Sequence, residues 1–264
     1  MGPDGRLPAG TAVGAGGRGG PMSGRRAWVA LVVAALFILA WEAGGGDLWV
    51  ARAVGAADGF PGRGQWVFRD LLHDDARWLS GFALAAWALW AAGRGERAVG
   101  PSRSERWRAW GLAVTLLLLV PAVKRLSLAS CPWDLALFGG TAQYLSHWTL
   151  WWPGSGDGGP GHCFPAGHAT SAFAFLPGVW LWWRHDRRKA VAWGGAVLVA
   201  GVLVSLAQTV RGAHFVSHNL WTAWLCWAAC AGLAPRLVAA GPQVLGHDTQ
   251  WRHARAVPQT IDRT

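Results

Sequence analysis

Six apolar stretches, each close to the length that crosses a bilayer, dominate this 264-residue sequence. An α-helix needs roughly 20 predominantly apolar residues to span the hydrocarbon core, where its backbone hydrogen bonds must be satisfied internally. The stretches lie at residues 27–43, 77–93, 107–123, 168–184, 189–209 and 216–234. The sequence therefore predicts an all-α, polytopic integral membrane protein with about six transmembrane helices in a bundle.

The composition agrees with a membrane protein and argues against a soluble domain. Hydrophobic residues make up 52% of the chain and charged residues only 14%, with a mean hydropathy of +0.22. These values are too apolar and too poor in charge for an ordinary soluble domain. The net charge of +10 lies in short clusters beside apolar segments rather than along one face, so nucleic acid is not an expected partner.

The chain divides into two tails and a membrane domain. Residues 1–26 are rich in Gly, Pro and Arg without an apolar period, which predicts a disordered N-terminal tail. Residues 27–235 form the predicted six-span domain, and residues 236–264 a cytoplasmic C-terminal tail. The first apolar stretch also has features of a signal peptide, with small residues at 54–57 for cleavage. Five further stretches favour an uncleaved anchor.

The basic residues give the orientation. With a cytoplasmic N-terminus, 17 of the 24 Lys and Arg residues fall on the cytoplasmic side. Cytoplasmic loops carry an excess of Lys and Arg, so both termini are expected in the cytoplasm. The abundance of Gly, Ala and Arg suggests a GC-rich bacterial genome, hence a bacterial inner membrane. Six of the nine histidines fall on the outer side: His73, His147, His162, His168, His214 and His218.

Three polar stretches lie at the outer ends of the predicted spans, namely 124–134, 162–168 and 211–218. The second and third bring histidines to the start of a helix, where unpaired N–H groups and the helix dipole favour an anion such as phosphate. Gly167 allows phosphate to approach the backbone closely, and Lys124 supplies a positive charge. Arg211 supplies a planar guanidinium that can donate two hydrogen bonds to phosphate oxygens. Two histidines can then act as nucleophile and acid, so we expect phosphoryl chemistry.

At these positions the chain resembles the type 2 phosphatidic acid phosphatase superfamily, whose signature reads Lys-x6-Arg-Pro, Pro-Ser-Gly-His and Ser-Arg-x5-His-x3-Asp. The resemblance runs from Lys124 to His218. It implies that His214 is the nucleophile and His168 the general acid, with Lys124 and the Gly167 backbone holding phosphate. It also implies a lipid phosphate substrate, such as phosphatidic acid, phosphatidylglycerol phosphate, undecaprenyl diphosphate or a lipid A phosphate, and no cofactor or metal.

Four positions depart from the signature. Cys131 and Gln208 stand where the family has Arg, Ala166 where it has Ser, and His218 where it has Asp. We expect Arg211, three residues before the nucleophile, to supply a guanidinium from another position. A neutral His218 is expected to accept a hydrogen bond from His214 as a carboxylate would.

The cysteines divide into an outer pair and an inner pair. Cys131 and Cys163 flank the first two polar stretches on a side that is oxidising in a Gram-negative bacterium, so we hypothesise a disulfide between them. Cys226 and Cys230 lie four residues apart in an apolar run and are expected to pack on one face of a buried helix.

A metal site is the alternative use of these histidines. His214 and His218 can share a helical face, with His162, Cys163 or His168 as further ligands. No carboxylate completes such a site, so the phosphate interpretation is favoured and no metal is predicted.

Two acidic features, Asp134 and the patch around His73, are interpreted as structural rather than catalytic. Asp134 either orients a catalytic group or caps the segment after Pro132, and the cap is favoured. The patch around His73 is expected to be solvated; its acidic members are Asp70, Asp74 and Asp75.

The favoured function is a lipid phosphatase that acts at the periplasmic face of the bacterial inner membrane through a phosphohistidine. A lipid phosphotransferase and a non-catalytic lipid-phosphate-binding protein remain alternatives, and a transporter is a third. The expected partners are a lipid phosphate substrate and membrane lipids.

Overall fold

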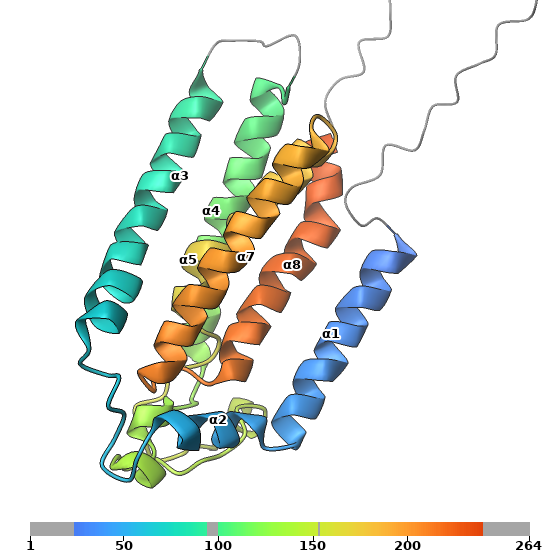
Figure 1. The fold of residues 1–264 in the computed structure, drawn as a ribbon. Helices are drawn as coiled ribbons and strands as arrows, with labels where there is room; N and C mark the ends of the chain where they lie inside the picture. The colour runs from blue at the N-terminus through green and yellow to red at the C-terminus, as the bar shows by residue number, and fades with distance from the viewer. Residues whose placement is uncertain (1–23, 94–99, 153, 240–264) are drawn as a thin grey trace, which may run out of the picture.

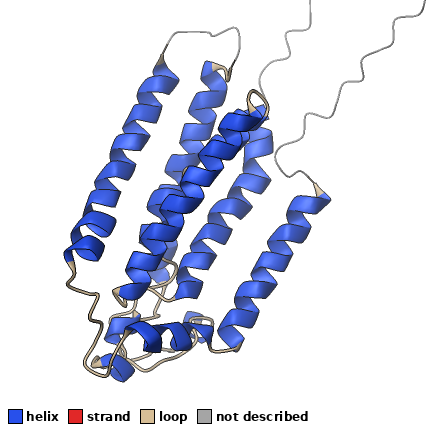
Figure 2. Cartoon of the chain, viewed as in Figure 1, coloured by secondary structure: helices blue, strands red, loops and turns tan. Residues whose placement is uncertain are grey.

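The computed structural model describes residues 24–93, 100–152 and 154–239, and within these the structure is helical (Figure 2). Two isolated β-bridges occur in this part of the chain, and no strand. The all-α prediction is confirmed for these ranges. The predictions for residues 1–23 and 240–264 lie outside the described residues.

Five of the six predicted spans are single helices. They are α1 (Arg25–Ala43), α3 (Ala76–Ala92), α4 (Arg103–Leu126), α7 (Arg187–Val210) and α8 (Val216–Ala239). Three of them, α1, α4 and α7, are long and apolar enough to cross a membrane, judged by length and composition. Their agreement with the predicted ranges follows from the apolar runs, which end at charged or Gly-rich segments.

Large apolar side chains cover the outside of the helices. Trp28 on α1 is 64% exposed, and Phe82 and Leu89 on α3 are 69% and 76% exposed. Such a surface is unfavourable in water and matches the hydrocarbon of a bilayer. The apolar helices therefore indicate membrane association.

The fourth predicted span is not one helix, so the prediction of a single transmembrane helix at 168–184 is wrong. The segment 168–184 forms α5 (Gly167–Phe173) and α6 (Pro177–Trp183), with a tight turn between them. Pro177 has no N–H to donate to the preceding turn and cannot continue α5. Within the turn, the carbonyl of Phe175 accepts the backbone N–H of Gly178 at 3.1 Å and the indole N–H of Trp193 on α7 at 2.8 Å.

The long helices run alongside one another, while α2 (Gly46–Val54) lies across one end of the bundle (Figure 1). A π-helical segment, η1 (Val67–Asp75), leads from this end into α3. The sequence analysis predicted neither α2 nor η1. The same end holds the last turn of α4 and the first turns of α5 and α8, so all three polar stretches meet there (Figure 1).

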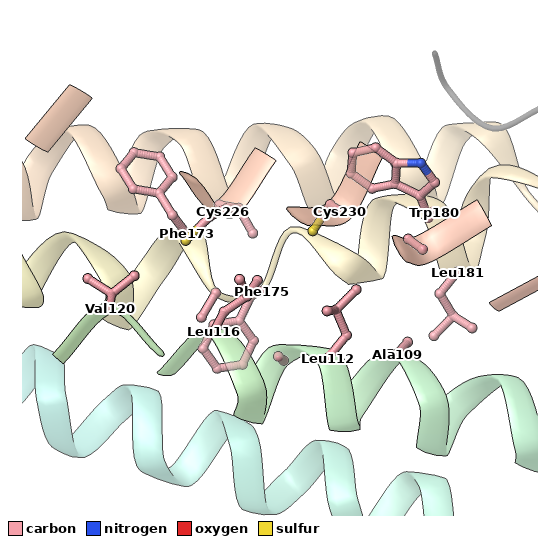
Figure 3. Close-up of a cluster of buried hydrophobic side chains, with 14 of the residues drawn as sticks. Ala109, Leu112, Leu116, Val120, Phe173, Phe175, Trp180, Leu181, Cys226 and Cys230 are labelled. Carbon is pink, nitrogen blue, oxygen red and sulfur yellow. The ribbon is translucent and has the colours of Figure 1, made fainter. Parts of the chain in front are cut away.

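The interior is a layer of closely packed apolar side chains between α4, α5, α6 and α8 (Figure 3). Leu116 of α4 packs here with Phe173 of α5, and Cys226 and Cys230 of α8 are fully buried, as predicted. In a bilayer, lipid tails are as apolar as Leu, so helix association depends on tight packing and small residues. Fully buried alanines such as Ala113 and Ala169 allow that approach.

Gly201 should be intolerant of a side chain. A Cβ at Gly201 of α7 would lie 2.4 Å from the Phe173 ring, whereas a Cβ at Gly195 of the same helix meets nothing. We expect Gly201→Ala to lower the detergent-solubilised unfolding temperature, at a cost of about 1–3 kcal/mol for overpacking. Gly195→Ala is the matched control and should raise stability slightly, because Ala favours helix over Gly. Equal effects of the two variants would contradict this packing.

Candidate active site

Lys124 lies beside the start of α5. It occupies the last turn of α4, and its Cδ and Nζ are 3.6 Å and 3.9 Å from the point where a Cβ would project from Gly167. Gly167 is the first residue of α5, so the ammonium group sits next to unpaired N–H groups of a helix N-terminus. The structure thus brings together these two predicted phosphate ligands.

The two predicted catalytic histidines face each other across the same end. The rings of His168, on α5, and His214, between α7 and α8, have centroids 6.1 Å apart. His214 is 2% exposed. Its turn depends on Gly212, which has a φ of +73° and packs so closely on the Phe60 ring that a Cβ would lie 2.3 Å from it. Only glycine fits this position.

The protonation state of His214 follows from its surroundings. Burial, with the nearby charge of Lys124 as the next cause, lowers the pKa of His214 well below its ordinary value. The ring is therefore neutral near pH 7 and keeps a lone pair for nucleophilic attack. Its Nδ1 lies 3.4 Å from the Sγ of Cys163.

His218 bonds to a backbone carbonyl and not to His214, in contrast to the prediction. Its Nδ1 is 3.1 Å from the carbonyl oxygen of Cys163, and the rings of His214 and His218 are 6.0 Å apart. Among the described residues no hydrogen bond joins the two rings, so that prediction is wrong. The Cys163 carbonyl is an obligatory acceptor buried at the first turn of α8, and a neutral imidazole satisfies it by donating from Nδ1.

Cys131 and Cys163 form a disulfide, with Cα atoms 5.1 Å apart, as hypothesised. Their sulfurs and a ring nitrogen of His214 lie within 4.8 Å of one another. Metal binding requires thiolates, and the disulfide leaves none at this cluster. Asp134 accepts the backbone N–H of Cys131 at 3.3 Å, so its predicted role as a cap is confirmed.

Arg211 is hydrogen-bonded to Gln208, which stands where the family signature has Arg. Its Nη1 donates to the Oε1 of Gln208 at 3.2 Å, and both residues are buried. The Nε of Arg211 is buried without a partner among the described residues. A guanidinium with an unpaired donor, three residues before His214 in the chain, is suited to a phosphate oxygen.

The profile of the PAP2 superfamily matches residues 106–240, about half of the chain. The chain belongs to the PAP2 superfamily. Comparison with curated proteins and with solved structures gave no match. Membership in the PAP2 superfamily indicates phosphatase activity on phosphate esters. The match includes every predicted site residue from Lys124 to His218.

Two acidic residues that precede the PAP2 match support its site, and sequence reasoning missed both. Asp47 of α2, 4% exposed, accepts the backbone N–H of Ser217 at 2.9 Å and also bonds the Ser217 hydroxyl. It thereby caps the N-terminus of α8 from another element. Glu42 of α1 accepts the indole N–H groups of Trp148 and Trp221 at 2.9 Å and 2.8 Å. Nothing local in the sequence signals these distant pairings.

Two histidines outside the signature also approach the PAP2 site. The ring of His73, in η1, lies over that of His168 with centroids 4.0 Å apart. The acidic patch is therefore not wholly solvated: its histidine covers the predicted acid, although Asp74 itself stays exposed. His147 stacks on Phe164 with centroids 3.9 Å apart and is edge-on to His218. His162, in contrast, is exposed and plays no part in this cluster.

The disulfide can be tested directly. Peptide mapping of unreduced protein should give a Cys131–Cys163 linked pair that is lost in Cys131→Ser and kept in the control Cys226→Ala. The bond closes a loop with a sequence separation of 32, so its loss should cost about 4 kcal/mol in the chain-entropy view and lower the unfolding temperature. Free thiols at both positions in native protein would contradict the structure.

The cap from α2 gives a second test. Asp47→Ala should destabilise the protein by about 2 kcal/mol, because it leaves buried donors of α8 unpaired. Thermal unfolding in detergent measures the change. Asp58→Ala removes an exposed carboxylate that follows α2 in the chain and should have little effect. An Asp47→Ala variant as stable as Asp58→Ala would show that α2 does not hold α8.

Proposed function

We propose that the protein is a membrane lipid phosphatase, which removes a phosphate from a lipid mono- or diphosphate at the periplasmic face of a bacterial inner membrane. The observation that carries the proposal is the pair of histidine rings 6.1 Å apart, with Lys124 beside the α5 N-terminus. This spacing leaves room for a phosphoryl group between a nucleophile and an acid.

The reaction proceeds in two steps, the formation of a phosphohistidine and its hydrolysis. His214 attacks phosphorus through its Nε2 lone pair, the bond to the leaving oxygen breaks, and that oxygen takes a proton from His168. A water molecule then cleaves the phosphohistidine with His168 as base, which releases orthophosphate and restores both rings. Lys124, Arg211 and the α5 amides hold the charge on the equatorial oxygens.

The neutral state of His214 suits this role. A buried imidazole that remained charged would have no lone pair, and its lowered pKa keeps the base form available down to acidic pH. The approach of a phosphate anion favours protonation of the neighbouring His168. One histidine is thus poised as nucleophile, and the other gains its proton when substrate binds.

A lipid substrate and an outer site are supported by the surroundings. The site lies at the end of apolar helices whose exposed faces match hydrocarbon, so a substrate anchored in the bilayer reaches it without leaving the membrane. The disulfide next to His214 requires an oxidising compartment. The excess of basic residues on the other side supports a cytoplasmic location for both termini.

A lipid phosphotransferase is the second candidate. A phosphohistidine can pass its phosphate to another lipid hydroxyl instead of water, and the same residues would serve. A non-catalytic lipid-phosphate binder is favoured by one observation, since Gln208 and His218 replace two residues of the family signature. Turnover separates these candidates.

The test is orthophosphate release by detergent-purified protein from a panel of lipid mono- and diphosphates, with chelator present. We expect metal-independent release, which falls on the order of 10³-fold or more in His214→Ala and about 10²- to 10⁴-fold in His168→Ala. His162→Asn is the control, because His162 is exposed and has a positive φ that Asn tolerates.

The outcomes separate the candidates. Transfer of label from one lipid to another without orthophosphate release would favour the phosphotransferase. Lipid-phosphate binding with no turnover of any lipid would favour the binder, and full activity in His214→Ala would exclude the mechanism.

A further inference from the structure

A cavity of about 480 Å³ opens beside His168, between α3, α4 and α5. Lys124, Gly167 and His168 line it, and so does Arg77 from the first turn of α3. Arg77 lies before the region that matches the PAP2 superfamily. His214 is not among the residues that line this cavity, but its ring lies 6.1 Å from that of His168, which does line it.

The cavity is positively charged, and two of its polar side chains, Arg77 and Thr170, have no partner among the described residues. None of its lining residues is acidic. Among the described residues no hydrogen bond or ion pair of Arg77 is present, since Asp70 pairs with Arg69 and Asp74 with His73. The hydroxyl of Thr170, 1% exposed, also lines the cavity without a partner. Two free cations and a free donor make a site for an anion.

One transferred phosphate does not account for this charge. The group attacked by His214 is served by Lys124 and the α5 amides, which adjoin each other, and by Arg211. Arg77 is a further cation, located on the cavity side of His168. His168 protonates the leaving oxygen, so the leaving group departs into the cavity that Arg77 lines.

An apolar groove of about 270 Å³ continues from this cavity. The two share Ser80 and Ser171, and the groove is lined further by Ala83 of α3 and by Trp193 and Ala200 of α7. Arg77 lines the cavity and its neighbour Ala76 lines the groove, so the first turns of α3 form part of the wall of both. His168 and Arg77 thus line a cavity that adjoins an apolar groove.

We propose, resting on the proposed function, that Arg77 binds an anionic leaving group and that the substrate is therefore a lipid diphosphate. The terminal phosphate bonds to Nε2 of His214 as its bond to the bridging oxygen breaks. That oxygen keeps the bonding electrons and takes the proton of His168. The remaining phosphate, still attached to the lipid, stays on Arg77 while the chain occupies the groove.

The kinetic test compares one lipid diphosphate with the monophosphate of the same lipid. Arg77→Gln should lower kcat/KM for the diphosphate roughly tenfold to hundredfold, the range for one charge-assisted hydrogen bond, and should change the monophosphate less than about threefold. Arg77→Lys should restore part of the loss. Arg125→Gln removes the same charge from an exposed residue that does not line the cavity and is the matched control. Equal losses on both substrates would overturn the proposal.

A binding measurement keeps this inference separate from the proposed function. Calorimetry on the His214→Ala protein should find inorganic pyrophosphate bound at least about tenfold more tightly than orthophosphate, and the added Arg77→Gln change should remove the difference. Equal affinity for the two anions before that change would overturn the proposal. If native protein hydrolyses neither lipid while the pyrophosphate preference depends on Arg77, the proposed function fails and the diphosphate site stands.

Discussion

The site depends on the contacts of one residue, Cys163. Its sulfur is bonded to Cys131 and lies against Nδ1 of His214, and its N–H donates to the Ala129 carbonyl at 2.8 Å. Its carbonyl accepts from His218. These contacts join the segment after α4, the segment before α5 and the turn before α8, which are the three stretches of the PAP2 signature. In a bilayer-bound chain such irregular backbone persists only when its polar groups are satisfied internally, and Cys163 does this at the point where the three stretches meet.

The same residue explains how the chain departs from its family. The signature provides a carboxylate four residues after the nucleophile, but here His218 occupies that position and bonds to the Cys163 backbone instead of to His214. His214 is then positioned by the Cys163 sulfur and by its own turn, whose N–H groups at Ala213 and His214 both approach the Gln208 carbonyl. Arg211 bonds to Gln208. The substitutions at 131, 208 and 218 are thus connected in space and form one alternative arrangement.

The N-terminal part, outside the PAP2 match, adds a second layer to the site. Asp47 caps α8 one residue before His218, and Glu42 holds two indoles that pack around the loop carrying His147. His73 covers His168 from the other side, and Arg77 lines the cavity beyond it. The residues of the PAP2 signature therefore come from one half of the chain. The side chains that surround the candidate site come from the other half.

The sequence by itself determined where the five long helices form and which residues make up the candidate site. Apolar runs of bilayer length fix where helices form, and Lys124, Gly167, His168 and His214 are recognisable because a phosphate site needs these residue types at helix ends. It did not determine the break at Pro177, the partner of His218, or the roles of Asp47, His73 and Arg77. The physical reason is range: helix formation depends on neighbours a few residues away, whereas Asp47 and Ser217 meet across 170 residues. Only the packing of the bundle decides which polar group meets which, and so it is the tertiary structure that turned separate motifs into one candidate site.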